Sequence, residues 1–337
     1  MKINFFLRKK FPGYFSIEQL FMSLCAHLNK QKDWGIEAQS VEVPFYFSTL
    51  NFFRNIRFVK KNQAAINHIT GDIHYAILGC SSKHVNILTI HDCVILERYG
   101  KWDPRYWIFR VFWYELPMRK ADVITVISEK TRDDLHNQIG YGKSKIRVVN
   151  NFVPENFEYV PQSFNHAKPR FLFIGSTANK NLDRILSAIS GIPCKLDIIG
   201  KISEQQEQFI LAHGIEIELF YELSLEELFE KYKQADLVLF PSLYEGFGML
   251  IIEAQAVGRP VVTSNISPMR EIAGKGAALV DPMDVDSIKN GIEKVMHDNA
   301  YREMIIAEGL LNSKKFSLGD VAGVYGSIYR EYYAKKN

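Results

Sequence analysis

Short runs of β-branched and other apolar residues recur along this chain, separated by stretches with helical periodicity. The clearest runs are VITVI (123–127), IRVV (146–149), FLFI (171–174), LDII (196–199), DLVLF (236–240) and PVVT (260–263). Continuous apolar strands that alternate with helices are typical of parallel sheets with both faces covered by helices. The pattern predicts an α/β protein and, because it occurs in both halves of the chain, two such sheets.

A break in this pattern divides the chain. Residues 154–170 (PENFEYVPQSFNHAKPR) contain three prolines and no periodicity, and a strand pattern restarts at FLFIG directly after them. A length of 337 residues also suits two domains of roughly 150 residues each. We expect a first domain over 1–157, a second over 158–315, and a C-terminal helix over 316–337 whose aromatic face suits packing back across the linker.

The composition of the chain and its lack of a recognisable targeting signal indicate which class of protein to expect. The chain is 47% hydrophobic and 23% charged, which is typical of a globular protein. Its four cysteines form no CxxC pair and no metal-ligand spacing, so neither a disulfide framework nor structural zinc is expected. The N-terminus lacks the apolar core of a signal peptide, and no stretch approaches the roughly 20 apolar residues of a membrane span. We therefore expect a cytoplasmic protein.

Positive charge is concentrated in the first half. Residues 1–160 contain 22 Lys and Arg and 15 Asp and Glu, whereas residues 161–337 contain 19 and 23. Within the basic half, residues 45–62 and 98–120 interleave aromatic residues with Arg and Lys. One interpretation is peripheral contact with an anionic membrane at the inner face of the cell; the other is core helices with solvated basic faces. No nucleic-acid-binding motif accompanies the charge, so nucleic acid is not an expected partner.

The stretch YEGFGMLIIEAQAVGRP (244–260) contains a glutamate within an otherwise apolar run. The preceding run DLVLF predicts a strand, residues 241–246 a loop, and residues 248–257 a helix that ends at a glycine. In open α/β sheets, ligands bind at the carboxyl ends of strands, and a helix N-terminus there favours anions. A glutamate inside such an apolar helix is unusual, because carboxylates are rarely buried unless they are paired or used.

Two glutamates, Glu245 in the loop and Glu253 in the helix, lie at most about 12 Å apart along the helix axis. That separation suits a nucleotide sugar, with one carboxylate on sugar hydroxyls, the other on ribose hydroxyls, and phosphates near the amides between them. The alternative is that Glu253 is a salt-bridged helix residue and Glu245 an ordinary loop carboxylate.

Residues 236–282 resemble the signature region of the group 1 (family 4) retaining glycosyltransferases. The two glutamates separated by seven residues in PSLYEGFGMLIIEAQAVGRPVV, the segment REIAG and the closing GAALVDP carry this resemblance. It is strong over 171–298 and weak before residue 90. The resemblance implies the GT-B architecture, in which two Rossmann-like domains with parallel sheets face a central cleft and the second binds most of the donor.

The resemblance also implies roles for individual residues. Glu253 would bond the donor ribose, and Glu245 would hold the sugar and diphosphate together with three backbone amides. Those amides belong to Gly246, Phe247 and Gly248. Lys180, in FIGSTANKNLDRIL, matches the lysine that neutralises the diphosphate, whose charge must be stabilised as the glycosidic bond breaks.

The chain departs from the family pattern at two places in the second domain. Ser176 and Thr177 stand where many relatives have an arginine that works with the lysine, so Lys180 works with helix dipoles alone or Arg184 substitutes. Tyr221 stands where relatives often have glycine beside the nucleobase. It either stacks on the base or blocks it.

The first domain matches the family less closely. Of the glycine-rich loop that approaches the donor phosphates in relatives, Pro12 and Gly13 remain. His91 follows the strand ILTI, and in relatives a histidine at this position touches the donor sugar. A lone histidine can equally be a satisfied structural residue, and Asp92 would orient the imidazole or cap the next turn.

For the mechanism, the resemblance implies front-face substitution, in which the leaving phosphate helps to deprotonate the acceptor. Glu245 and His91 are the catalytic-site candidates, Glu245 as a positioning residue rather than a base. No cofactor or metal is expected, since the one D-x-D, Asp284 to Asp286, falls at a helix start and is typical of an N-cap.

These features predict a retaining glycosyltransferase that moves a sugar from a nucleotide-sugar donor to a saccharide or lipid-linked saccharide in surface polysaccharide biosynthesis. The alternative is a noncatalytic GT-B scaffold or partner subunit of a glycan assembly complex, because the glycine loop is eroded and the arginine is missing. A nicotinamide dehydrogenase is not expected, since no G-x-G-x-x-G follows a strand.

Overall fold

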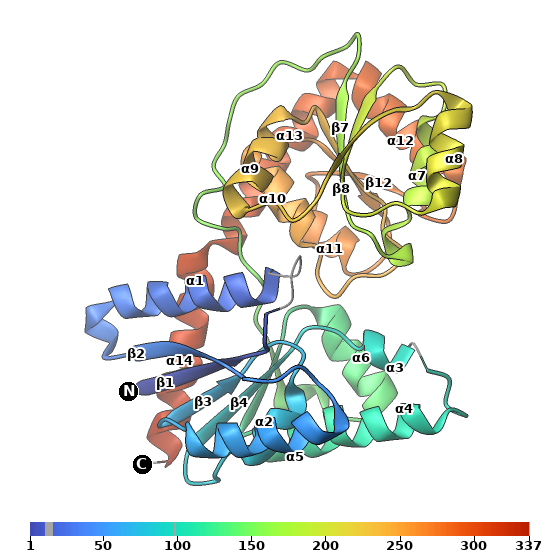
Figure 1. Ribbon diagram of the computed structural model, residues 1–337. Helices are drawn as coiled ribbons and strands as arrows, with labels where there is room; N and C mark the ends of the chain where they lie inside the picture. The colour runs from blue at the N-terminus through green and yellow to red at the C-terminus, as the bar shows by residue number, and fades with distance from the viewer. Residues whose placement is uncertain (11–15, 98, 337) are drawn as a thin grey trace. The chain divides into compact units, whose positions relative to one another are not determined.

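A computed structural model describes residues 1–10, 16–97 and 99–336, so Gly13 lies outside the described residues. The chain forms two compact units (Figure 1). The first comprises Met1–Asn151 and Leu318–Asn337, and the second comprises Phe152–Ser317. Each contains one six-stranded sheet in which all neighbouring strands are parallel. The prediction of an α/β chain with two parallel sheets is confirmed.

The first sheet has the strand order β2-β1-β3-β4-β5-β6. Its strands are β1 (Lys2–Leu7), β2 (Glu37–Glu42), β3 (Ile66–Ile69), β4 (Val85–Ile90), β5 (Val123–Val126) and β6 (Ile146–Val148). The chain reverses its direction of winding between β1 and β3, which is the topological switch point of this sheet.

Helices cover both faces of the first sheet, as continuous apolar strands require. In Figure 1, α1 (Ser16–Lys30) and α14 (Leu318–Lys336) lie on one face, and α2 (Thr49–Lys61) and α5 (Leu116–Lys120) lie on the other. The remaining helical elements are η1 (Lys32–Trp34), η2 (His74–Gly79), α3 (Val94–Glu97), α4 (Pro104–Phe109), the π-helical segment η3 (Arg110–Glu115), α6 (Glu129–Ile139) and η4 (Lys143–Lys145).

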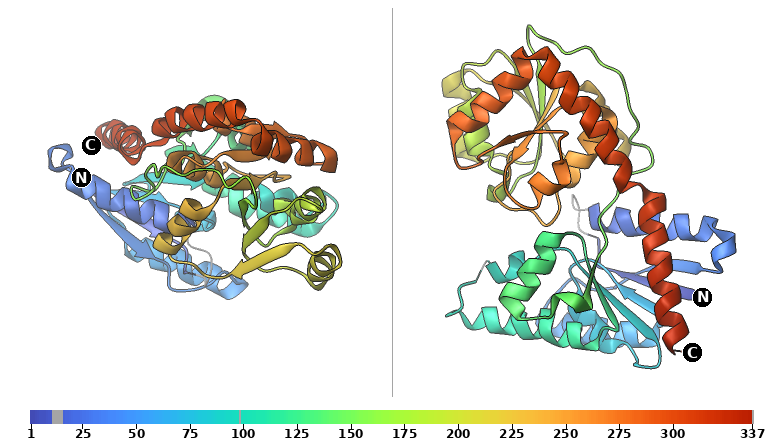
Figure 2. Two further views of the ribbon diagram at one scale, coloured as in Figure 1. Left: turned by 90° about the horizontal axis from the view of Figure 1, so that it is seen from above. Right: turned by 180° about the vertical axis from the view of Figure 1, so that it is seen from behind.

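The C-terminal helix α14 packs on the first unit beside α1, and both chain termini lie in this unit (Figure 2). The aromatic face expected of this helix is its contact surface, because Tyr325, Ile328 and Tyr329 are buried. The Tyr329 hydroxyl is hydrogen-bonded at 2.9 Å to Nδ1 of His68 on β3. Burial of a tyrosine with its hydroxyl satisfied holds the helix against the sheet.

The second sheet has the order β12-β11-β10-β7-β8-β9. Read from β9, this is the 3-2-1-4-5-6 order of a dinucleotide-binding Rossmann sheet, with its switch point between β7 and β10. The strands are β7 (Arg170–Ile174), β8 (Lys195–Ile199), β9 (Glu216–Phe220), β10 (Leu237–Phe240), β11 (Val261–Ser264) and β12 (Ala278–Val280). Ligands are therefore expected at the carboxyl ends of β7 and β10.

Helices also cover both faces of the second sheet, with α7, α8 and α12 on one face and α9, α10 and α13 on the other (Figure 1). The helical elements are η5 (Ala178–Lys180), α7 (Leu182–Ile189), α8 (Glu204–His213), α9 (Leu225–Gln234), α10 (Met249–Val257), α11 (Met269–Ala273), α12 (Val285–His297), α13 (Asn299–Ser313) and η6 (Lys314–Phe316). Among the described residues, no helix is both long and apolar enough to cross a membrane.

The helix over the two-glutamate stretch forms as its glycines indicate. Gly248 is the N-cap of α10 with φ +110°, and Gly258 ends the helix with φ +78°. Both conformations favour glycine, because a side chain strains the backbone at positive φ. The D-x-D motif also has its expected local role, since Asp284 caps α12 and its carboxylate accepts a hydrogen bond from the Asp286 amide.

Candidate active site

Two loops lie side by side at the carboxyl ends of β7 and β10. The Asn179 carbonyl accepts from the Leu243 amide at 2.7 Å, and the Asn179 side chain donates to the Tyr244 carbonyl at 3.0 Å. The buried Asn181 side chain donates to the carbonyls of Pro241 and Pro282, at 2.9 and 2.7 Å. Two asparagines therefore fix the turn after β7 against the loop after β10.

Lys180 lies between these two asparagines, and its Nζ is 2.7 Å from Oε1 of Glu245. Both side chains are mostly buried, with 19% and 14% of their surfaces exposed. Gly175, at φ +147°, makes room for the lysine, because a Cβ there would lie 2.4 Å from Lys180 Cγ. The sequence singled out Lys180 and Glu245, and the structure brings them together.

The amino end of α10 continues from this pair. Phe247 is buried, and its ring meets that of Phe316 edge-on at 5.8 Å between centroids. In the part of the chain that the structure describes, no side chain caps the first turn of α10. The amides of that turn, with the partial positive charge of the helix end, therefore have capacity to bind an anion.

Glu253 lies in the middle of α10 and is only 7% exposed. The hydroxyl of the fully buried Tyr232, on α9, donates a hydrogen bond to its carboxylate at 2.8 Å. Burial raises the pKa of Glu253 to about 7, although the Tyr232 hydrogen bond and the nearby Lys180 charge oppose that rise. A tyrosine hydroxyl therefore holds this glutamate, and no salt bridge to Glu253 occurs among the described residues.

The other predicted residues of the second unit have different surroundings. Ser176 Oγ accepts a hydrogen bond from the Lys201 amide at 2.7 Å, so it joins the loops after β7 and β8. Arg184 donates to Asn181 Oδ1 at 3.0 Å and thus supports the turn that carries Lys180. Tyr221 follows β9 at the edge of the sheet and is 51% exposed.

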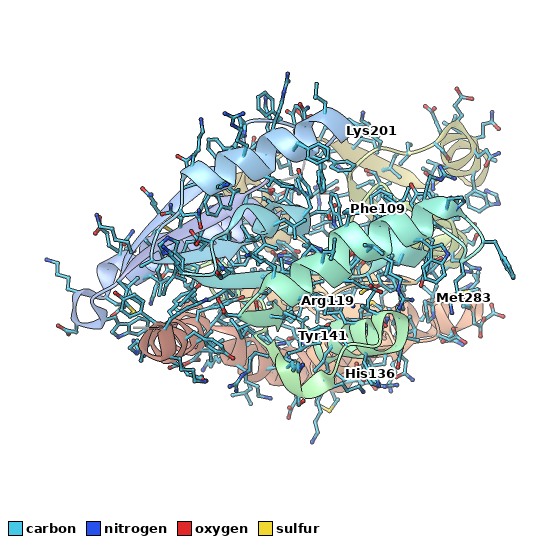
Figure 3. The ribbon with its side chains drawn as sticks, turned by 90° about the horizontal axis from the view of Figure 1, so that it is seen from below. Phe109, Arg119, His136, Tyr141, Lys201 and Met283 are labelled. Atoms are coloured by element: carbon cyan, nitrogen blue, oxygen red, sulfur yellow. The ribbon has the colours of Figure 1, made fainter. Side chains whose placement is uncertain are left out.

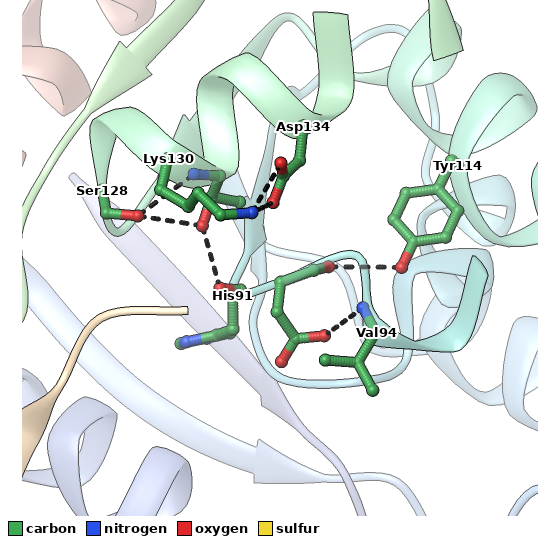
Figure 4. A network of polar contacts seen from close by, with 8 residues as sticks. His91, Val94, Tyr114, Ser128, Lys130 and Asp134 are labelled. Carbon is green, nitrogen blue, oxygen red and sulfur yellow. Dashed lines mark hydrogen bonds and ion pairs between the residues drawn. The ribbon is translucent and has the colours of Figure 1, made fainter. Parts of the chain in front are cut away.

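His91 follows β4 in the first unit and is 8% exposed. Its backbone carbonyl accepts a hydrogen bond from Thr131 Oγ1 at 3.2 Å (Figure 4), which anchors it to the start of α6. Its ring meets Phe21 edge-on at 5.9 Å, and its Nε2 has no hydrogen-bond partner among the described residues.

Burial, together with the charges of His74 and Arg8, lowers the pKa of His91 to about 3. The imidazole is therefore neutral near pH 7 and could offer one ring nitrogen to a ligand. Asp92 takes one of its two expected roles, because its carboxylate accepts from the Val94 amide at 3.0 Å and caps the following turn (Figure 4).

Four residues of the site were not identified from the sequence. They are Gly175, Asn179, Asn181 and Tyr232. The two asparagines flank Lys180 directly, so the segment NKN was the available signal. Nothing in the sequence pointed to Tyr232, because it lies on a different helix from Glu253 and belongs to no local motif. Within the described ranges, no cluster of three or more His, Cys, Asp and Glu side chains could hold a metal ion.

The sequence of this chain matches two models of glycosyltransferase families. A family model described as glycosyl transferases group 1 matches residues 156–310, and one described as glycosyltransferase family 4 matches residues 29–157. The O-antigen chain mannosyltransferase B of Escherichia coli is 41% identical over 92 residues, which are 27% of this chain and 24% of that protein.

A serotype-specific mannosyltransferase WbdA of Escherichia coli is 28% identical over 265 residues, covering 70% of this chain and 32% of that protein. The matched segments thus span about a quarter of the length of the first relative and about a third of the length of the second. Among solved structures, Anabaena Alr3699/HepE in complex with UDP and glucose superposes with a TM-score of 0.75 at 16% identity, covering 98% of this chain and 100% of that chain. This similarity shows a shared fold.

Proposed function

The chain belongs to the group 1 glycosyltransferases of family 4 and has their GT-B fold, and from that premise we propose that it is a retaining sugar transferase. The donor is a nucleotide sugar, and the acceptor is a saccharide or a lipid-linked saccharide. Relatives named as O-antigen and serotype-specific mannosyltransferases support a place in surface polysaccharide assembly. The proposed location of the reaction is the cytoplasmic face of the membrane. The UDP and glucose bound to Alr3699/HepE support a nucleotide sugar as the donor.

One observation carries this proposal: Lys180 and Glu245 meet at the carboxyl edge of the second sheet, where α10 begins, and Glu253 lies within that helix. In the proposed complex, the Lys180 ammonium and the amides of residues 246–248 neutralise the donor diphosphate. Glu253 accepts hydrogen bonds from the ribose hydroxyls, and Glu245 accepts them from the sugar. Tyr221 lies near the nucleobase.

The proposed reaction breaks the bond between the anomeric carbon and the leaving phosphate oxygen, and the acceptor oxygen attacks from the same face. The departing phosphate takes the acceptor proton, so the protein needs no carboxylate nucleophile. Lys180 and the helix amides stabilise the negative charge that develops on the leaving group. His91, neutral near pH 7, bonds a hydroxyl of the donor sugar and positions it for attack.

The test is transfer by the purified protein in the presence of EDTA, with a panel of nucleotide sugars and with saccharide and lipid-linked acceptors. We expect one donor to be consumed and the anomeric proton of the product to show the donor's configuration by NMR. Inversion at the anomeric carbon would overturn the retaining assignment, and loss of transfer in EDTA would overturn the metal-independent one. If the protein binds a nucleotide but no donor turns over with any acceptor, it is the noncatalytic scaffold.

A further inference from the structure

The outward stripe of α2 is apolar at one end and basic at the other. Leu50 and Phe53, in the first turns, are 62% and 67% exposed. Arg54 and Arg57 follow at helical spacing on the same stripe and are also exposed, whereas Asn55 and Val59 face the core. Large exposed apolar side chains next to cations are not explained by the packing of this unit, because the helix already buries its other side.

A second helical segment adds to this surface. On α4 and η3, Trp107, Ile108 and Phe112 are 51%, 55% and 44% exposed. The ring of Phe52 joins the two elements, because its centroid lies 5.1 Å from that of Phe53 and 6.2 Å from that of Phe112.

Figure 3 shows the segment from α4 to α5 crossing this side of the molecule, past the labelled Phe109 and Arg119. We call this surface the α2–α4 face. It comprises Leu50, Phe53, Arg54, Arg57, Trp107, Ile108 and Phe112.

The α2–α4 face is set in positively charged surroundings. Residues 43–71 contain four Lys and Arg and no Asp or Glu. Residues 99–120 contain five Lys and Arg and two acids, and both acids are in ion pairs, Asp103 with Arg105 and Glu115 with Arg110, each at 2.7 Å. The cations also lie over exposed rings, as in Arg110 over Trp107 at 5.3 Å. The positive charge is therefore not cancelled locally.

We propose that the α2–α4 face docks on an anionic lipid bilayer. Rings and aliphatic side chains enter the headgroup layer, and the guanidinium and ammonium groups meet lipid phosphates. A second copy of this chain fits less well, because two such faces in contact would bring like charges together. Nucleic acid fits less well because no nucleic-acid-binding motif accompanies the positive charge. The proposal rests on the first unit alone and goes beyond the transfer reaction.

Flotation of the full chain with vesicles tests the proposal. The vesicles contain phosphatidylcholine either alone or mixed with phosphatidylglycerol. We expect binding to the mixed vesicles that weakens as salt is added. The double variant Arg54→Gln with Arg57→Gln should bind about 25-fold more weakly, at about fivefold for each charge removed. Phe53→Ser with Ile108→Ser should also lose binding.

Matched variants in the second unit serve as controls. Leu211→Ser removes a leucine that is 75% exposed on α8, and Lys275→Gln with Lys314→Gln removes two exposed cations. These variants should bind vesicles like the original protein. All variants should keep the original circular dichroism and nucleotide binding, which shows that they fold and separates this test from that of the donor site.

Several results would overturn the proposal. The first is equal binding to both kinds of vesicle, or binding to neither. The second is equal loss of binding in the control variants. Competition by single-stranded RNA at equal charge would identify a nucleic-acid surface, and concentration-dependent dimerisation that Phe53→Ser abolishes would identify a contact between copies.

Discussion

At the scale of single residues, the surroundings of Glu253 bear most directly on the proposed binding of a nucleotide. Its carboxylate is buried against the Tyr232 hydroxyl, and its pKa is raised to about 7. The sequence could show that a glutamate interrupts an apolar helix. It could not show what holds that glutamate, because the partner lies on another helix, 21 residues earlier in the chain.

The raised pKa of Glu253 predicts how stability depends on pH. The pKa rises from 4.5 to about 7 on folding, so ionisation opposes folding as the pH increases between these values and the full penalty applies above them. Glu253→Gln keeps a hydrogen-bond acceptor for Tyr232 and has no charge to bury. Its stability relative to the original protein should therefore rise by about 3 kcal/mol between about pH 4.5 and pH 7. Urea unfolding at several pH values measures this, and a difference that is independent of pH would contradict it.

Lys180→Met should weaken nucleotide binding. The substitution removes the cation proposed for the diphosphate and leaves the carboxylate of Glu245 beside an anionic ligand. Loss of a hydrogen bond to a charged group costs about 1.5–3 kcal/mol, so we expect affinity to fall by about 10- to 100-fold. Titration calorimetry measures the change, and Lys275→Met is the matched control for loss of an exposed lysine. Unchanged affinity in Lys180→Met would remove this lysine from the donor site.

At the scale of elements, hydrogen bonds join the turn after β7 to the loop after β10. Asn181 has φ +66°, a left-handed conformation that asparagine tolerates better than most residues, and its side chain bonds three partners. Asn181→Ala should destabilise the protein by about 3 kcal/mol, at about 1 kcal/mol for each hydrogen bond. It should also weaken nucleotide binding, because Lys180 loses its support. Thermal unfolding and calorimetry measure the two effects, and a loss of stability with unchanged binding would show that the turn does not position the lysine.

The apolar runs in the sequence identified most central strands and the edge strand β6, but not the edge strands β2 and β9. The apolar runs at 123–127 and 236–240 coincide with β5 and β10, because buried parallel strands are apolar on both faces. The edge strands β2 (EAQSVE) and β9 (EIELF) carry acidic and polar residues, because an edge strand is partly exposed. The short β3 (INHI) was missed because its buried Asn67 and His68 look polar in sequence, whereas in the structure both are hydrogen-bonded.

The candidate site was predictable to a similar extent. Spacing and glycines located the helix, Lys180 and both glutamates, since these features are local in sequence. The contacts that orient them were not predictable, because Asn181 and Tyr232 act on loops and helices that are distant in the chain. The expected C-terminal aromatic face was correct in kind, and its polar partner His68 appears only in the structure.

At the scale of the whole molecule, the uneven distribution of charge along the sequence matches the division of the chain into two units. The excess of Lys and Arg in residues 1–160 includes the cations around the α2–α4 face, whereas Lys180 and the two glutamates belong to the second unit. The proposed function assigns the nucleotide contacts to the second unit, and the further proposal assigns membrane docking to the α2–α4 face of the first. Each task can fail without the other, so variants of one unit should leave the other task intact.

The most direct test of the central claim, that the second unit binds a nucleotide at the carboxyl ends of β7 and β10, is a thermal-shift screen. The original protein and Glu253→Ala are compared with UDP, GDP, ADP, CDP, dTDP and their common sugars. A ligand near 100-fold its dissociation constant adds about 2.7 kcal/mol, so one nucleotide series should raise the melting temperature by several degrees in the original protein and by less in the variant. If no nucleotide shifts the original protein, or if Glu253→Ala responds equally, the donor does not bind at the carboxyl ends of β7 and β10.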